Sequence, residues 1–547
     1  MTSDVPPTAL FAPKLVTVLR EGYGFAGLRA DAIAGLTVAV VALPLSMAIA
    51  IASGTTPERG LYTAIVGGFL ISALGGSRFQ VGGPAGAFIV LVAACVARHG
   101  IEGTVLATFM AGLFLMAAGA FRLGTFIKFI PYPVTVGFTA GIAVIILASQ
   151  LRDLFGLTLA GREPGEFMAK IEVLAEAWGT VNAASVALAL LTIGGIAGLK
   201  RLRPHWPGML LAVAAASLAT FVLGLPVETI GSRFGGIPSL LPMPGLPDVS
   251  LAKIEAVLPD AMAFALLGAI ESLLSAVVAD GMTGRRHRPN VELVAQGVAN
   301  IGAALFGGIP ATGTIARTAT NVRAGARGPV AGMLHSVFLL VFMLLAAPLA
   351  AYIPLAALAG VLAVVAWNMA EKHEFATLLR SSRGDAVVLL ATFLLTVFRD
   401  LTEGIVVGSA LGAVLFIHRM TGTAAVEEQR LPPFAPELTA DPDIVVYRLS
   451  GAFFFGTAST VGTVLDRIAD RHKAFVIDLA AVPFIDSTAA NVIAGIGRKA
   501  ARHGVRVYVT GAITPVRRAL LRAGAGRPKV RYLPKIEDAV RAVHETV

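Results

Sequence analysis

The sequence predicts an all-α polytopic membrane protein that carries a small α/β domain at its C-terminal end. Hydrophobic residues make up 56% of the 547 residues and charged residues only 14%, against roughly 25% charged in typical soluble domains. The charge is also uneven: about 12% of the first 422 residues are charged, but about 23% of the last 125. This composition excludes a purely soluble enzyme and a disordered chain, and the single cysteine, Cys95, excludes a disulfide scaffold.

Apolar runs of membrane-spanning length fill the first part of the chain. A helix that crosses a bilayer needs about 20 mostly apolar residues, and a window of that length predicts fourteen whole or broken spans. They lie near 31–53, 60–76, 80–98, 102–121, 131–151, 182–199, 206–224, 256–280, 290–306, 309–323, 328–351, 354–370, 384–400 and 403–421. A further stretch, 165–179, is amphipathic and is expected to lie along the surface.

The basic residues predict the orientation of these spans. With a cytoplasmic N-terminus, the inside loops and ends hold eighteen Lys and Arg residues and the outside loops eight. Positive charge gathers in cytoplasmic loops of membrane proteins. The even number of spans then returns the C-terminal domain to the cytoplasm, so we expect a multi-pass protein of the inner (plasma) membrane.

The composition and the predicted spans divide the chain into four parts. They are a cytoplasmic N-terminal segment (1–30), a membrane domain (31–422), a Pro-rich linker (423–442) and the C-terminal domain (443–547). The net charge of +10 divides equally between the first 422 residues and the last 125. No basic stripe interleaved with aromatic residues occurs, so we expect no nucleic-acid partner.

Two motifs recur in the same order at nearly the same offset. Pro131, followed by a glycine six residues later, recurs at Pro354, a shift of 223. Pro84, in a glycine-rich segment, recurs at Pro310, a shift of 226. Seven spans per copy is an odd number, so the second copy must be inverted in the membrane, as in many secondary transporters.

The Gly/Pro-interrupted segments of spans 3 and 10 predict a site between the two repeats. Each is expected to form a short extended piece followed by a half-helix that starts near Pro84 or Pro310. Irregular backbone at membrane depth is tolerated only where it is buried in protein or lines a cavity. Two half-helix N-termini that face each other carry partial positive charge and free N–H groups, which suits an anion.

Two formal charges fall deep within the predicted spans, Glu271 and Arg317. Charged groups at such depth mark ion or substrate pathways. Ser275 lies four residues after Glu271, so its hydroxyl shares a helix face with the carboxyl group. Because desolvation disfavours the charged form of a buried carboxyl, Glu271 is a candidate proton carrier. Arg317, placed two turns into the half-helix, is expected to pair with Glu271 or with the anion, or else to lock spans 8 and 10 together.

The C-terminal domain shows strand and helix patterns in alternation. Short β-rich runs occur at 444–449, 474–479 and 505–509, and helical stretches near 458–470, 487–502, 515–523 and 535–545. Ser487, in Asp486-Ser487-Thr488, stands where a helix should begin. No Walker loop, metal-ligand set or catalytic triad occurs, so we expect no enzyme activity, no metal and no cofactor.

The chain resembles the SulP anion permeases, the microbial relatives of animal solute carrier family 26. The resemblance rests on five features: 57–62 (PERGLY), 83–86 (GPAG), 271–275 (ESLLS), 306–310 (FGGIP) with Arg317, and a terminal domain similar to STAS domains with 484–488 (FIDST). It implies two inverted seven-span repeats of uracil-permease type, a core domain that moves against a gate domain, and a homodimer. In STAS relatives that regulate sigma factors, the serine that corresponds to Ser487 is phosphorylated, and a cytoplasmic partner of this domain is expected but unknown.

The chain differs from some members of the family that it resembles at positions that bear on the substrate and the coupling ion. Sodium-coupled bicarbonate members carry an Asp in span 8, a Thr four residues later and a second Thr in span 10. This chain has Glu271, Ser275 and, at the aligned third position, Ile315. These departures weaken a sodium site, and the segments 317–326 and 365–369 are most similar to bacterial members that move sulfate or dicarboxylates with protons.

The sequence therefore predicts a proton-coupled symporter of sulfate or a dicarboxylate that works by an elevator-like movement. The anion would bind at Arg317 and at the backbone N–H groups of Ala85, Gly86, Ala87, Gly313 and Thr314, with Glu271 and Ser275 at the proton site. Three alternatives stay open: sodium–bicarbonate symport, a channel-like, uncoupled or exchange pathway for chloride or another anion, and a membrane-tethered signalling protein whose spans only anchor a STAS domain.

Overall fold

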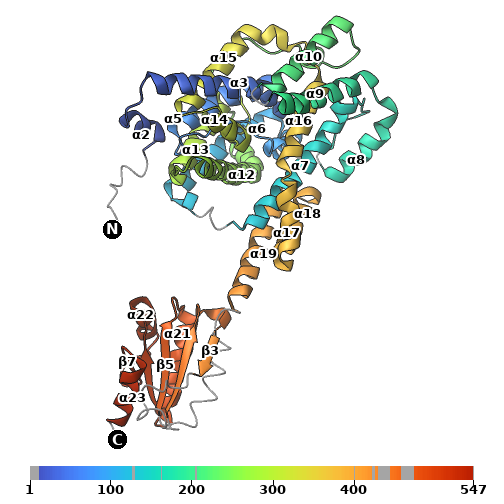
Figure 1. Ribbon diagram of the computed structural model, residues 1–547. Coiled ribbons are helices and arrows are strands. Elements are labelled where there is room, and N and C mark those ends of the chain that lie inside the picture. Colours follow the sequence, from blue (N-terminus) through green and yellow to red (C-terminus); the bar gives the residue numbers. More distant parts are fainter. Residues whose placement is uncertain are drawn as a thin grey trace. The chain divides into compact units, whose positions relative to one another are not determined.

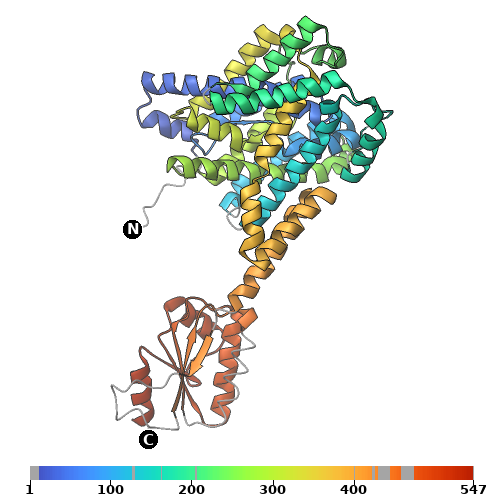
Figure 2. The same cartoon turned by 45° about the vertical axis from the view of Figure 1, so that its right-hand side comes forward.

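The computed structural model describes residues 12–125, 130–161, 163–164, 166–203, 206–399, 401–421, 425–428, 444–457 and 474–545. It divides into two compact units, Met1–Ser409 and Ala410–Val547, which Figures 1 and 2 show from two sides. The first unit is almost entirely helical and the second contains a five-stranded sheet, so the predicted fold class is confirmed.

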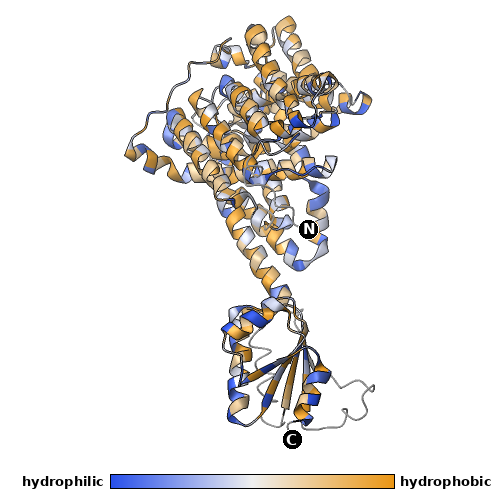
Figure 3. Ribbon diagram, turned by 90° about the vertical axis from the view of Figure 1, so that its left-hand side faces the viewer, coloured by the Kyte–Doolittle hydropathy of each residue, from blue (hydrophilic) through white to orange (hydrophobic). Residues whose placement is uncertain are grey.

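Apolar helices build the first unit, and its ribbons are coloured mostly as hydrophobic in Figure 3. Eight helices in the described part of the chain are long and apolar enough to cross a membrane. The helices that correspond to the predicted spans are α3 (Phe25–Ala52), α4 (Pro57–Tyr62) with α5 (Gly68–Leu74), α6 (Phe88–Ala120), α7 (Tyr132–Phe155), α9 (Ala183–Leu202), α10 (Gly208–Leu223), α12 (Leu251–Thr283), α13 (Pro289–Leu305), α14 (Ile315–Arg323), α15 (Val330–Ala350), α16 (Leu355–Met369), α18 (Arg383–Phe398) and α19 (Leu401–Thr421).

The difference between eight long helices and fourteen predicted spans has local causes. Span 2 is divided by a π-helical turn, Thr63–Gly67, between α4 and α5. Spans 3 and 4 form one interrupted helix, α6, which breaks at Gly100 with φ +68°. Span 10, α14, has only nine residues. Each predicted span thus has a helical counterpart, and the number that crosses the bilayer stays a prediction.

The helices of the first unit pack in two groups. One group, here called the core, contains α3 to α6 and α12 to α15, in which α6 packs on α12 and α13, and α3 on α15. The other, here called the gate, contains α7, α9, α10, α16 and α18, in which α7 packs on α16 and α18. Helices α10 and α16 also contact α3, so the two groups meet along this helix.

Short helices connect the spans. The predicted amphipathic stretch forms α8 (Phe167–Glu176) and a 3-10 turn (Ala177–Thr180), and Leu174 is the only buried residue of α8. The sequence analysis missed α2 (Lys14–Arg20), α11 (Ile230–Phe234) and α17 (Lys372–Ser381). All three are too short to give the apolar run by which spans are recognised.

The second unit contains a sheet of order β3-β4-β5-β6-β7, in which only the β3–β4 pair is antiparallel. The strands are β3 (Ala425–Glu428), β4 (Ile444–Ser450), β5 (Ala474–Ala481), β6 (Arg506–Thr510) and β7 (Val530–Leu533), and the helices are α21 (Ser487–Arg502), α22 (Thr514–Arg522) and α23 (Ile536–His544). Of these elements, β4, β5, β6 and all three helices were predicted; β7 was missed, and β3 lies inside the predicted linker. The helix expected near 458–470 lies outside the described residues.

We expect cysteine labelling to confirm the orientation of the first unit. Native Cys95 is the single cysteine and is fully buried, so we expect its replacement by alanine to be tolerated. The Cys95→Ala background then has no thiol to react with a membrane-impermeant maleimide. In that background Glu102→Cys, an exposed position at the predicted outer end of span 4, should react in intact cells. Arg285→Cys, in a loop predicted to be inside, should react only after permeabilisation. Labelling of Arg285→Cys in intact cells would contradict the orientation.

Candidate functional site

Two short strands cross in the middle of the core, one from each repeat. Strand β1 (Gly82–Gly83) pairs with β2 (Thr312–Gly313) in antiparallel register, with Gly82 opposite Gly313. Antiparallel pairing is what a two-fold axis in the membrane plane gives to equivalent segments. Each strand is followed by a helix of the core, α6 after β1 and α14 after β2. The crossing therefore directs two helix N-termini into one region.

The half-helices begin later than the prolines predict. Helix α6 starts at Phe88, four residues after Pro84, and α14 starts at Ile315, five residues after Pro310. Neither proline occupies a first helical turn, so this part of the prediction is wrong. Strand β2 takes up residues 312–313 between Pro310 and α14, whereas β1 ends just before Pro84. The pairing of β1 with β2 satisfies backbone groups that helix would otherwise satisfy.

The backbone groups that could bind an anion differ in part from those predicted. Before α6, Ala85 and Ala87 are buried, and Ala87 is the N-cap residue. Before α14, the N–H group of Thr314 donates to the carbonyl oxygen of Val81 at 3.2 Å, so it is not a free donor. The first N–H groups of a helix have no partner within it. The donors at the second N-terminus are therefore those at 315–317 rather than that of Thr314.

Arg317 lies in the first turn of α14, not two turns in, and its side chain is buried within the core. Its Nη2 donates to Ser46 Oγ at 3.0 Å and to the Pro84 carbonyl at 3.3 Å, and its Nη1 donates to the Gly82 carbonyl at 3.2 Å. The predicted pair with Glu271 is not formed. Arg317 instead ties α14 to α3 and to the segment before α6, and it places a full positive charge behind the two N-termini.

Glycines make room for this arrangement. A Cβ atom at Gly83 would lie 1.9 Å from Arg317 Nη1, and the φ of Gly83 is +153°, which L side chains rarely adopt. A Cβ atom at Gly313 would lie 1.5 Å from Gln80 Nε2. Side chains at these two positions would displace Arg317 or Gln80 from the crossing.

Glu271 stands on α12 with a free oxygen. Its Oε2 atom is buried and has no hydrogen-bond partner in the described part of the chain. Ser275, which was expected to share a site with it, donates from Oγ to Thr318 Oγ1 at 3.0 Å, and Thr318 Oγ1 also accepts the N–H of Val81 at 3.2 Å. The hydroxyl groups of α12 and α14 thus meet one helical turn from Glu271.

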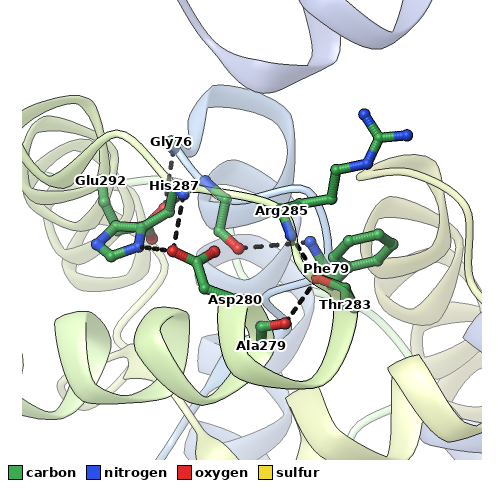
Figure 4. A network of polar contacts seen from close by, with 9 residues as sticks. Gly76, Phe79, Ala279, Asp280, Thr283, Arg285, His287 and Glu292 are labelled. Carbon is green, nitrogen blue, oxygen red and sulfur yellow. Dashed lines mark hydrogen bonds and ion pairs between the residues drawn. The ribbon is translucent and has the colours of Figure 1, made fainter.

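The sequence analysis missed Glu292, a second buried carboxyl group, which lies in α13. Its Oε2 accepts the N–H groups of Gly76 at 2.8 Å and Ser77 at 3.0 Å, and its Oε1 accepts Gln296 Nε2 at 3.0 Å. Figure 4 shows Glu292 beside His287, whose Nδ1 lies 2.7 Å from Asp280 Oδ2.

From Glu292 the contacts continue to the crossing. Ser272 Oγ lies 3.4 Å from Glu292 Oε1 and accepts Gln80 Nε2 at 2.7 Å. The signal for this network was present in the sequence: 292, 296 and 300 are polar at four-residue spacing on an otherwise apolar helix, a stripe that marks one buried face.

Polar side chains also hold the segments that precede β1 and β2. Asn300 Oδ1 accepts the N–H of Ala311 at 2.9 Å, and Asn300 Nδ2 donates to the carbonyl oxygen of Ala311 at 2.8 Å. Thr63 Oγ1 accepts the Ile309 N–H at 2.8 Å. Asn321 Nδ2 donates to the Phe79 carbonyl at 2.9 Å. The crossing is thus a fixed piece of backbone within the core.

The gate covers the first half-helix. A Cβ atom at Gly86 would lie 3.2 Å from Cδ1 of Ile146, which belongs to α7. The predicted anion position at 85–87 therefore lies at the boundary between core and gate. In chemical terms the arrangement offers N–H donors and a positive charge, without a nucleophile paired to a base.

Ser487 lies in the second unit, apart from this site. It is exposed and is the first residue of α21. The capping residue is Asp486, whose Oδ1 accepts the Ala489 N–H at 2.8 Å, rather than Ser487. The hydroxyl of Ser487 is left accessible beside the start of the helix.

Comparison with known proteins gives the family. Residues 28–392 match the profile of the Sulfate permease family and residues 435–539 that of the STAS domain. YvdB of Bacillus subtilis, provisionally named a sulfate transporter, is 40% identical over 494 residues, 90% of this chain and 93% of its own length. The bicarbonate transporter BicA of Picosynechococcus sp. is 30% identical over 523 residues, 91% of each chain.

Solved structures agree in fold. The murine solute carrier 26 family member A9 anion transporter, in its inward-facing state, has a TM-score of 0.86 at 18% identity over 100% of this chain and 96% of its own. The transmembrane domain of a cyanobacterial BicA has a TM-score of 0.64 at 32% identity, over 70% of this chain and 98% of its own. With the paired half-helices and the C-terminal sheet already described, these matches show that the chain belongs to the sulfate permease family of membrane anion transporters and carries a STAS domain.

Proposed function

We propose that this protein is a secondary active transporter that moves sulfate or a small dicarboxylate together with a proton. The observation that carries the proposal is the crossing of β1 and β2, which directs the N-termini of α6 and α14 together in front of Arg317. Helix N-termini favour anions through their free N–H groups and their dipoles. A tetrahedral or planar oxyanion can accept several such N–H donors at once.

The proposed movement is elevator-like, with the core sliding against the gate. The crossing, both half-helices and Arg317 all belong to the core, so a bound anion would travel with them. The contact between Gly86 and Ile146 of the gate is the point at which the anion position would be covered or uncovered. A homodimer held through the gate domains is the assembly expected for such a mechanism.

Glu271 is the proposed proton carrier. Its buried Oε2 is unpaired in the described part of the chain, and a buried carboxylate without a partner is costly in a low dielectric. Binding a proton removes that cost, and Arg317, whose three hydrogen bonds go elsewhere, does not compete for the group. With the proton on Glu271, the positive charge of Arg317 would offset one of the two charges of the bound anion during the movement.

Sodium–bicarbonate symport is the second candidate, and one observation favours it. Ser275 and Thr318 bring two hydroxyl oxygens together one turn from Glu271, so Thr318 supplies the oxygen that Ile315 lacks. Carboxylate and hydroxyl oxygens are the ligands that hard cations prefer. The 30% identity to BicA over nearly the whole chain supports the same alternative.

We expect uptake into proteoliposomes to separate these candidates. Labelled sulfate, bicarbonate and fumarate are each offered with an inward proton gradient and, separately, with a sodium gradient. Proton-stimulated uptake of sulfate or fumarate supports the proposal, and sodium-driven uptake of bicarbonate supports the alternative. Uptake that follows the anion gradient alone and ignores both cations indicates a channel-like or uncoupled pathway and contradicts symport.

The Glu271→Gln variant should lose gradient stimulation. Glutamine keeps the size of the side chain but cannot bind and release a proton, so we expect the stimulation of uptake by a proton gradient to fall at least tenfold. Glu255→Gln is the matched control, because Glu255 is an exposed residue of the same helix, and it should behave as wild type. Full proton stimulation in Glu271→Gln would exclude Glu271 as the carrier.

The Gly83→Ala variant should damage the crossing itself. Its Cβ would meet Arg317 Nη1 in a backbone conformation that already costs alanine about 1–3 kcal/mol. We expect a lower melting temperature of the purified protein and a loss of uptake of about tenfold or more. Gly100→Ala separates the two effects, because Gly100 also has a positive φ but no atom within 4 Å of its Cβ position. If both variants lose uptake equally, the contact with Arg317 is not what matters.

A further inference from the structure

A hollow of about 300 Å³ opens beside the first half-helix, between core and gate. Its inner wall includes Ile89, the second residue of α6, and Val96 further along the same helix. On the gate side it is lined by the C-terminal end of α7, by α8 and by α11. The hollow thus follows α6 from its N-terminus toward the end of the unit that the basic residues assign to the outside.

Among the described residues, five charged side chains line this hollow, and four of them are paired. Asp153 Oδ1 lies 3.1 Å from Arg233 Nη1, and Glu163 Oε1 lies 2.9 Å from Lys170 Nζ. Arg152 is the fifth. Its Nε is buried and has no hydrogen-bond partner within the described residues. The described part of the lining therefore carries a surplus of one positive charge, and that surplus belongs to Arg152.

A buried guanidinium N–H without an acceptor is costly unless a ligand supplies one. The planar guanidinium matches an oxyanion through two parallel hydrogen bonds, which makes arginine suited to carboxylate, sulfate and bicarbonate. The remaining walls are apolar and contain Ile51, Val90 and Ile145, so a bound anion would be partly shielded from water and its attraction to Arg152 would be strong.

We propose that Arg152 forms an outer docking subsite for the transported oxyanion, which the anion occupies before it moves along α6 to the crossing. This inference rests on the proposed transport function and adds to it a second binding position. The two ion pairs hold the neighbouring acids away from the anion. Because the hollow reaches Ile89, three residues beyond Gly86, an anion released by Arg152 enters the field of the α6 N-terminus directly.

Sided transport kinetics test the subsite. In right-side-out vesicles we expect Arg152→Gln to raise the KM for external sulfate about five- to tenfold while Vmax stays within twofold. In inside-out vesicles the KM should not change, because the hollow belongs to one end of the unit. Arg152→Lys keeps the charge but loses the planar fork, so its KM should be intermediate.

A variant expected to change the KM in the opposite direction distinguishes loss of the subsite from loss of folding. Glu163→Gln frees Lys170 and raises the surplus charge of the hollow, so it should lower the KM for external sulfate, most clearly at low ionic strength where screening is weak. Lys253→Gln removes a charge predicted to lie outside but remote from the hollow, and its KM should equal that of wild type. An unchanged KM in Arg152→Gln, or equal changes in both vesicle orientations, would overturn the subsite.

Binding provides a readout that does not need transport. Calorimetric titration of purified full-length protein with sulfate, bicarbonate and fumarate should detect a weak site that Arg152→Gln removes and Gly83→Ala retains. If wild type shows this site but transports none of the anions, the proposed function fails and the subsite stands. If Arg152→Gln binds all three anions as wild type does, the subsite is refuted whether or not transport occurs.

Discussion

Burial of the Arg317 guanidinium beneath two crossing strands is the constraint on which the rest of the membrane unit depends. A charge at such depth needs acceptors for its donors. Here Nη1 and Nη2 find them in Ser46 Oγ on α3 and in the carbonyl oxygens of Gly82 and Pro84, while Nε has no partner within the described residues. These acceptors come from three places in the first repeat, so the arginine of the second repeat fixes both repeats as one core. The same charge makes the region between the two helix N-termini attractive to an anion.

The crossing in turn requires that every extended backbone group around it find a partner. Thr63 and Asn300 supply donors and acceptors to the segment before β2, and Gln80 connects the crossing through Ser272 to Glu292. Irregular backbone in a membrane protein is stable only with such internal satisfaction. The network therefore explains why polar residues occur on α12 and α13, whose other neighbours are apolar, without assigning each of them to transport.

The helices could be predicted because a long apolar run is a strong signal. The segments of spans 3 and 10, where the site was predicted, do meet in the structure. The prediction failed on register. The prolines suggested a shift of 226 between repeats, whereas the first residues of the two paired strands, Gly82 and Thr312, are 230 apart. Pairing across the two-fold axis sets the register, and a proline that only borders the strands does not. For the same reason the depth of Arg317 in its helix was overestimated.

Contacts between distant segments were beyond the sequence. Glu271 and Arg317 were the natural pair by charge, yet Arg317 bonds to backbone carbonyls that no pattern of side chains reveals. Glu292 lies in the first turn of α13, close to the end of a predicted span. Its burial follows from hydrogen bonds with the N–H groups of Gly76 and Ser77, which lie far away in the sequence. Ser275, expected beside Glu271 on the same helix, bonds to Thr318 of α14. Residues whose partners lie on another helix or in the other repeat could not be predicted.

In the proposed symport, the distribution of charge along the path explains why a fixed acidic group would hold the coupling cation. At the outer end the hollow carries the surplus charge of Arg152, and at the other end a cavity of about 690 Å³ is lined by Lys200 and Arg323. A surplus of positive charge at each mouth concentrates anions and repels free cations. A coupling cation must therefore be held at a fixed acidic group rather than in the open path. Glu271, whose Oε2 has no hydrogen-bond partner in the described part of the chain, is the carboxyl group proposed to hold it on the core helix α12.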